Sequence, residues 1–310
     1  MAGSSNAPKS WLVGDSGLMV SINAAGDIRT RAQLTDASLN GLTRVDEYTA
    51  WAVGDEGEIL YTTDGGAHWV RQDVVTKAAL YAVSFSNAQH GVAAGAAGTM
   101  LETDDGGAHW HLVGVESSAA ETRAYRAVAL SPTTGNGVAV GDAGLLSWTT
   151  DSGRTWTSNS AAGPTALTGV ALNEDDVAIA VGRGGAAYRI DHEGVQPLHW
   201  AATSVRDLAA VRFLGDGDHL VAVGAQGTIL EAQLSTSAVS VAASATQEDL
   251  YAVAVFSGDS SHRDGDLNER VMAVGANGAL VLQAHSGAAF EAVPSHTTAV
   301  IRSLDGLSGE

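Results

Sequence analysis

A glycine pair spaced as G-x-x-G recurs seven times along the 310 residues, usually behind an Ala-Val or similar run. Successive first glycines lie 40, 41, 46, 41, 42 and 51 residues apart, which is the period of a four-stranded propeller blade. The pattern predicts an all-β fold, a seven-bladed β-propeller of antiparallel blades. The pairs are Gly14/Gly17, Gly54/Gly57, Gly95/Gly98, Gly141/Gly144, Gly182/Gly185, Gly224/Gly227 and Gly275/Gly278.

The unit from residue 80 to residue 112 shows the repeat most clearly. A β-rich run over Leu80–Phe85 is followed by a polar turn and a second run that ends at Gly95. A third run over 99–103 enters an Asp-Asp-Gly-Gly turn, and a fourth run follows from residue 109. Short runs bounded by Gly and Asn/Asp turns are typical of an antiparallel meander.

Copies of the first run locate the blades and predict how the ring closes. The last copy, Ile301–Leu304, has no second run after it, whereas the chain opens on Trp11–Gly14, a second run without a first. We therefore expect the two ends to complete one blade, so that residues 11–310 form a single domain behind a flexible leader, residues 1–10. The copies are Leu42–Val45, Leu80–Val83, Tyr125–Val128, Leu167–Val170, Leu208–Val211, Leu250–Val253 and Ile301–Leu304.

The charge and composition exclude several classes of function. Acidic residues outnumber basic ones by 35 to 16, a net charge of −19, which disfavours nucleic acid and anionic membranes as partners. No apolar run reaches about 18 residues, so no membrane span is expected. The absence of cysteine excludes disulfides, thiol catalysis and zinc–thiolate sites.

We expect a monomer without a cofactor. A periplasmic or extracellular location is favoured only if the leader is the remnant of a signal peptide; otherwise the compartment stays open.

An insertion over residues 257–270 accounts for the longest spacing. Its segment from Asp264 to Asn268 resembles the start of a calcium loop, D-x-D-x-N. The sixth position is Glu269 instead of glycine and the twelfth is Gly275 instead of glutamate, so the EF-hand pattern fails. We expect a solvated acidic loop, with a weak calcium site at 264–269 as the alternative, and no other metal site.

Three turns between third and fourth runs share the Asp-box pattern S/T-x-D-x-G-x-T-W. They cover residues 62–69, 103–110 and 149–156, with the carboxylates Asp64, Asp105 and Asp151. Each carboxylate can accept hydrogen bonds from turn N–H groups, and the tryptophan that ends each box can fill the gap between sheets. We therefore expect structural boxes with largely buried tryptophans. His68 and His109, inside two of the boxes, are interpreted as turn residues, with a metal pair as the alternative.

With its L-x-A-V and A-V-G-x-x-G runs and its Asp boxes, the chain resembles the propeller family of photosystem II assembly/stability factors. The resemblance covers residues 11–307. It implies an Asp-box propeller with a peptide-binding or assembly role, and boxes that lie on the face away from the usual active site. Asp-box propellers also include sialidases, xyloglucanases and sorting receptors, so the resemblance is specific for the fold.

We expect a binding site at the mouth of the central channel, where the first runs begin beside the G-x-x-G turns. The second residue of each first run should ring this mouth: Thr43, Tyr81, Arg126, Thr168, Ala209, Tyr251 and Arg302. The turns add Asp15, Asp55, Glu56, Asp142, Arg183, Gln226 and Asn277.

Three classes of function remain open. The first is a non-catalytic binding or assembly propeller that recognises a peptide, protein or glycan through Tyr81, Arg126, Tyr251 and Arg302. The second is a glycoside hydrolase or lyase, for which Asp15, Asp55, Glu56 and Asp142 could supply two carboxylates. The third is a purely structural module or a lectin-like repeat binder. For the mouth tyrosines and arginines themselves, the alternative to recognition is that they plug the channel by stacking on one another.

Overall fold

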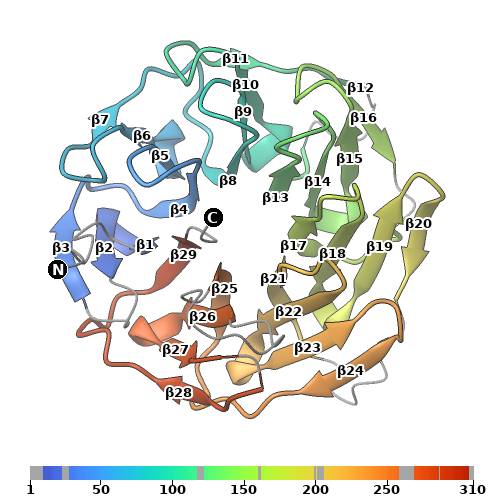
Figure 1. Ribbon diagram of the computed structural model, residues 1–310. Helices are drawn as coiled ribbons and strands as arrows, with labels where there is room; N and C mark the ends of the chain where they lie inside the picture. Colours follow the sequence, from blue (N-terminus) through green and yellow to red (C-terminus); the bar gives the residue numbers. More distant parts are fainter. Residues whose placement is uncertain are drawn as a thin grey trace, which may run out of the picture.

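The computed structural model describes residues 10–22, 28–116, 122–159, 162–198, 200, 206–257, 269–285 and 287–306. Seven antiparallel sheets follow one another around a central axis, which confirms the predicted seven-bladed propeller (Figure 1). Residues 1–9 of the expected leader and residues 258–268 of the insertion lie outside the described residues. Within the described ranges, no helix is long and apolar enough to cross a membrane.

The blades are numbered from the one that holds the first strand of the chain. Blade 1 contains β29 (Ile301–Gly306), β1 (Ser10–Gly14), β2 (Leu18–Ile22) and β3 (Ile28–Gln33). Blade 2 contains β4 (Leu39–Arg44), β5 (Ala50–Gly54), β6 (Ile59–Thr62) and β7 (Val70–Arg71). Blade 3 contains β8 (Leu80–Phe85), β9 (Gly91–Gly95), β10 (Met100–Thr103) and β11 (His111–Leu112). Blade 4 contains β13 (Tyr125–Leu130), β14 (Gly137–Gly141), β15 (Leu146–Thr149) and β16 (Trp156–Asn159).

The last three blades have the same plan. Blade 5 contains β17 (Leu167–Leu172), β18 (Ala178–Gly182), β19 (Ala187–Asp191) and β20 (Gly194–Pro197). Blade 6 contains β21 (Leu208–Phe213), β22 (His219–Gly224), β23 (Ile229–Gln233) and β24 (Ala238–Val241). Blade 7 contains β25 (Leu250–Ser257), β26 (Glu269–Gly275), β27 (Leu280–Gln283) and β28 (Phe290–Ala292). The expected insertion, residues 257–270, therefore begins with the last residue of β25 and ends with the first two residues of β26.

Two details of strand pairing matter for the whole ring. In blade 1, the C-terminal β29 pairs antiparallel with β1, with Leu304 opposite Leu12, which confirms the predicted closure. The red β29 lies beside the blue strands of blade 1 in Figure 1. In blade 4, β12 (Val115–Glu116) adds a fifth strand, parallel to β16, which the sequence did not predict.

The core consists of seams between neighbouring blades. Between blades 2 and 3, Trp51 stacks on Phe85 with ring centroids 3.6 Å apart. Between blades 7 and 1, Leu12 and Met272 belong to one buried cluster with Ile301. Each blade thus buries apolar side chains on both of its faces, and each seam requires its neighbour.

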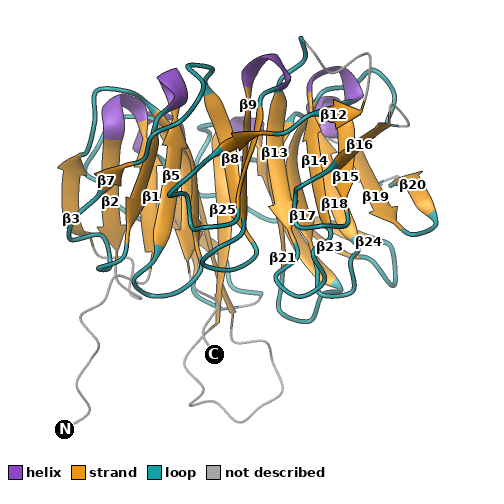
Figure 2. Ribbon diagram, turned by 90° about the horizontal axis from the view of Figure 1, so that it is seen from above, coloured by secondary structure: helices purple, strands orange, loops and turns teal. Residues whose placement is uncertain are grey.

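The G-x-x-G turns form seven short 3-10 turns at one end of the ring, shown in purple in Figure 2. They are η1 (Asp15–Gly17), η2 (Asp55–Gly57), η3 (Ala96–Gly98), η4 (Asp142–Gly144), η5 (Arg183–Gly185), η6 (Ala225–Gly227) and η7 (Ala276–Gly278). We call this end, with the segments that lead into the first strands, the η-turn face.

Close backbone contact explains the first glycine of every turn and the second glycine of five turns. In blade 4, the N–H of Asp142 donates to the carbonyl of Ala124, the residue before the first strand. A Cβ on Gly141 would lie 2.0 Å from that same carbonyl oxygen. A Cβ on Gly144, whose φ is +69°, would lie 1.6 Å from the carbonyl oxygen of Gly163. The repeated motif therefore fastens the second strand of each blade to the start of its first strand.

The Asp boxes lie at the opposite end, next to the turns between first and second strands. The N–H of Gly65 donates to the carbonyl of Tyr48, and the other two boxes make equivalent bonds. Trp110 and Trp156 are buried as expected, with exposed fractions of 3% and 1%. Trp69 differs from the expectation: it is only half-buried, and it packs edge-on against Trp11 at a centroid distance of 5.6 Å.

Candidate functional site at the channel mouth

The first strand of every blade carries a β-bulge at its second residue. In blade 3, Leu80 pairs with Gly95 and Ala82 pairs with Ala94, so Tyr81 has no partner on β9. A bulge redirects the side chain of the extra residue. The first strands lie innermost (Figure 1), so these residues surround the channel mouth at the η-turn face, and we call them the bulge ring. The bulge ring consists of Asn40, Tyr81, Arg126, Thr168, Ala209, Tyr251 and Arg302.

The prediction for blade 2 was wrong by three residues. Leu39 pairs with Gly54, so Leu39 and not Leu42 begins the repeat, and Asn40 occupies the place expected for Thr43. The two leucines are three residues apart and each is followed by a polar residue, so the pattern alone fits both alignments. Leu39 is the one whose preceding residue, Ser38, reaches the η2 turn: the Ser38 carbonyl accepts the N–H of Asp55.

Arg126 of the bulge ring is held on both sides. Its Nε and one Nη donate to the two carboxylate oxygens of Asp142 at 2.9 and 3.0 Å. Its Cζ lies 4.7 Å from the centroid of the Tyr81 ring in blade 3. The hydrogen bonds from Arg126, together with its charge, lower the pKa of Asp142, and the Arg183 charge acts in the same direction. Three predicted residues, Tyr81, Arg126 and Asp142, thus meet between blades 3 and 4.

A second, more open group lies across blades 7 and 1. The Nε of Arg302 donates to Oδ1 of Asp15 at 2.6 Å. Burial raises the pKa of Tyr251, and the nearby charge of Asp249 adds to that shift, while Arg302 opposes it. The structure therefore brings Tyr251, Arg302 and Asp15 together, as the sequence analysis expected for the mouth.

The remaining predicted turn residues lie in blades 2 and 5. Asp55 accepts a hydrogen bond from Nδ2 of Asn40 at 2.9 Å, and the same amide donates to the carbonyl of Leu80 at 3.0 Å. Glu56 is exposed in the left-handed region with a φ of 60°, and Arg183 is exposed in η5.

The bulge ring and the turns match each other blade by blade. Where the first η residue is an aspartate, the bulged residue of the same blade donates a hydrogen bond to it. Where the first η residue is alanine, the bulged residue is tyrosine or alanine. The aspartate pairs are Asp15 with Arg302, Asp55 with Asn40, and Asp142 with Arg126.

Sequence reasoning missed the acidic residues just before the first strands. Asp249 accepts the N–H of Gln226 in the preceding blade at 2.8 Å, and Asp207 accepts the N–H of Gly184 at 2.8 Å. Next to Asp249, Glu248 accepts a bond from Nδ2 of Asn277 at 2.8 Å. An acidic residue directly before a first-strand leucine was the available signal, at Asp207 and Asp249.

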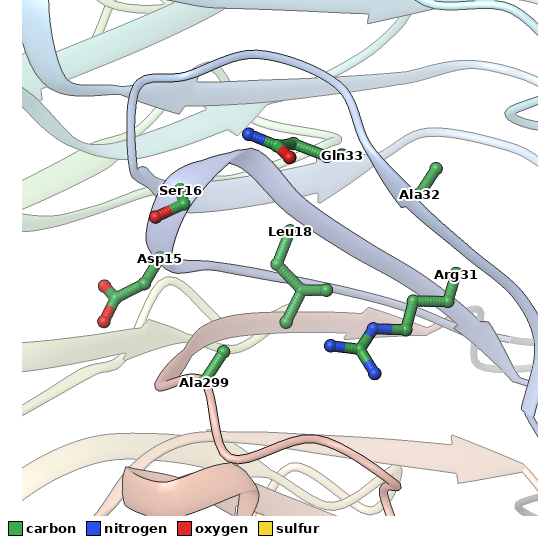
Figure 3. A pocket seen from close by; sticks show the side chains of 7 residues that line it. All are labelled: Asp15, Ser16, Leu18, Arg31, Ala32, Gln33 and Ala299. Carbon is green, nitrogen blue, oxygen red and sulfur yellow. The ribbon is translucent and has the colours of Figure 1, made fainter.

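A groove of about 600 Å³ continues outward from Asp15. Figure 3 shows Leu18 at its centre, Ala299 on the side of the segment leading into β29, and Arg31 at its outer end. Arg31 donates to the carbonyl of His296 at 2.8 Å and to Oγ1 of Thr297 at 3.2 Å, so it spans from blade 1 to the segment after blade 7. Between its two charged ends the lining is mixed, with apolar Leu18, Ala32 and Ala299 beside polar Ser16 and Gln33.

The box histidines make local bonds on the far face. Nδ1 of His68 lies 2.7 Å from Asp64, and Nδ1 of His109 lies 2.6 Å from Asp105. In the third box, Thr155 stands at the position of the histidine, and its Oγ1 donates to Asp151 at 2.7 Å. Across the described part of the chain, no three His, Asp or Glu side chains converge as metal ligands would. Asp264, Asp266 and Asn268 of the calcium-like segment lie outside that part, whereas Glu269 begins β26.

Solved structures resemble this chain over most of its length. YCF48 bound to a D1 peptide is 18% identical, with a TM-score of 0.64 over 93% of this chain and 84% of that chain. YCF48 from Cyanidioschyzon merolae is also 18% identical, with a TM-score of 0.64 over 85% and 87%. The WD40 propeller of Doa1 is 10% identical, with a TM-score of 0.69 over 96% and 89%. At these identities the likeness shows the fold alone.

Sequence comparison adds the family. No curated protein sequence matches the chain significantly. The family model described as photosynthesis system II assembly factor YCF48 matches residues 67–253, which is more than half of the chain. Together with the Asp boxes and the seven-bladed ring, this match shows that the chain belongs to the YCF48 family of photosystem II assembly factor propellers.

Proposed function

We propose that the protein is a non-catalytic assembly propeller that holds an extended peptide segment of a client protein at the η-turn face. The observation that carries the proposal is the bulge ring, in which Arg126 and Arg302 are fixed by Asp142 and Asp15. Fixed guanidinium groups lose little freedom when they donate to a ligand, and tyrosine and arginine are frequent at binding hot spots. The YCF48 structure with a D1 peptide supports a peptide as the ligand class.

The glycosidase or lyase alternative has less support from the mouth. A general acid needs a raised pKa, whereas the pKa of Asp142 is lowered by its hydrogen bonds with Arg126. Asp15 and Asp55 each accept a hydrogen bond from the bulge-ring residue of their own blade, Arg302 and Asn40 respectively. These carboxylates therefore serve to position the bulge ring.

The proposal is tested with peptides selected from a library against the immobilised full chain. Arg126→Ala combined with Arg302→Ala should weaken binding of the selected peptides about tenfold or more, because two hot-spot donors are lost. Arg154→Ala, which removes an exposed arginine from a box on the opposite face, is the matched control and should leave binding unchanged. A folded double variant that binds as tightly as the unmodified chain would place the peptide site elsewhere.

A further inference from the structure

The two bulge-ring tyrosines, Tyr81 and Tyr251, stand in the same local sequence, Leu-Tyr-Ala-Val, but differ in what covers their rings. The ring of Tyr81 is covered by Arg126 of the next blade. The equivalent arginine beside Tyr251 is Arg302, whose Nε is bonded to Asp15. Among the described residues no cation lies over the Tyr251 ring, and the residue is 38% exposed. The chain thus contains one closed tyrosine–arginine pair and one open tyrosine.

Three carboxylates of the η-turn face act electrostatically on Tyr251. Asp249, Glu248 and Asp15 are all close enough to act on its hydroxyl, and Arg302 is the opposing charge. Each carboxylate is held through one oxygen, by Gln226, Asn277 and Arg302 respectively. Their second oxygens accept no hydrogen bond from the described residues. A cation placed over Tyr251 would gain from the ring face and from these fixed negative charges.

The groove that begins at Asp15, the partner of Arg302, gives the ligand a direction. It starts at Asp15, runs over Leu18 and Ala299, and ends at Arg31, whose charge disfavours a second cation there. Its volume of about 600 Å³ is within the range of ligand clefts. The groove therefore suits a chain with a basic group at the mouth end and small apolar groups farther out.

We propose that the blade 7–blade 1 side of the mouth binds a basic residue of an extended peptide, with its lysine or arginine over Tyr251 and the following small apolar residues in the groove. This inference rests on the proposed function and names the peptide class that the same site selects. The two Nη groups of Arg302, which make no bond with the described residues, donate to a backbone carbonyl of the peptide. Arg302 thus contributes affinity for any peptide, and Tyr251 contributes the preference for a cation.

The experiment uses two fluorescein-labelled peptides, Lys-Ala-Leu-Ala-Gly and its glutamine counterpart Gln-Ala-Leu-Ala-Gly, with anisotropy read against the full chain. We expect the lysine peptide to bind about fivefold tighter or more, a ratio that falls in high salt. Tyr251→Ala should bring the ratio close to one, and Tyr251→Phe should keep it, because the ring face remains. Tyr48→Ala, at an exposed tyrosine beside an Asp box, is the matched control and should keep the full ratio.

The possible outcomes separate this inference from the proposed function. Arg302→Ala should weaken the glutamine peptide, whereas the preference for lysine should persist or increase, because the guanidinium that is removed opposes a cation over Tyr251. Equal binding of the two peptides by the unmodified chain would overturn the inference while the peptide-binding function stands. A lysine preference that survives Tyr251→Ala would overturn it as well. If neither these probes nor any library peptide binds, both proposals fail.

Discussion

At the scale of single residues, the Asp boxes show how a side chain replaces turn backbone bonds. Asp64 accepts the N–H of His68 at 2.9 Å and the hydroxyl of Thr62 at 2.9 Å. The backbone and side-chain hydrogen bonds from His68 lower the pKa of Asp64 to about 2. In the third box, Thr155 makes the same two contacts to Asp151 that His68 makes to Asp64. The histidines therefore make the turn contacts that Thr155 makes in the third box.

The lowered pKa of Asp64 predicts an acid-dependent contribution to stability. A carboxyl whose folded pKa lies below its unfolded value of about 3.9 stabilises the fold above that value. This stabilisation is lost as the pH falls from about 4 through about 2. Asp64→Asn should therefore lower the urea midpoint at pH 7 and reduce the loss of stability over that pH window. His68→Thr, which restores the residue type of the third box, should keep the unmodified pH response. An Asp64→Asn curve parallel to the unmodified curve would contradict the assignment.

At the scale of elements, the first glycine and the central residue of an η turn are under different constraints. The first glycine is in close contact with backbone, whereas the central residue only needs a positive φ. In blade 5, a Cβ on Gly182 would lie 2.2 Å from the carbonyl oxygen of Ala166, which is already bonded to the N–H of Arg183. A Cβ on Gly184 would meet nothing within 4 Å, although its φ is +64°. Alanine already occupies the equivalent central position at Ala97 and Ala143.

Two alanine substitutions in this one turn should therefore differ. Gly182→Ala forces the first strand away from the turn and should cost about 1–3 kcal/mol or more, as overpacking does. Gly184→Ala should cost only about 1 kcal/mol, the strain of a left-handed residue. Urea unfolding of the two variants measures the difference. Equal losses would show that backbone conformation, and not the close approach, sets the requirement for glycine.

At the scale of the whole molecule, closure of the ring decides stability, because every seam needs both of its blades. β29 contributes Ile301 and Leu304, which are 0% and 1% exposed, and it covers the inner edge of β1. Ending the chain at Val300 should remove about 1.5–3 kcal/mol for each of these side chains, together with the strand pairing. We expect aggregation or a much lower thermal midpoint in a calorimeter. A chain that ends at Val300 and melts at the same temperature as the full chain would refute the closure.

The sequence alone determined the number of blades, the closure by the two ends, the box turns and most of the mouth residues. Each of these follows from a sequence pattern that recurs every 40 to 51 residues, complete or cut short at the two ends, so one clear copy locates the others. The tertiary structure decided the register of blade 2, in which the bulged residue is Asn40 and not the predicted Thr43. It also decided the bulge that redirects the side chain of each residue of the bulge ring. It also decided which charges meet, since Arg302 and Asp15 are 287 residues apart and become neighbours only when the ring closes. Periodicity specifies the strands, whereas the partners of their side chains depend on the geometry of adjacent blades.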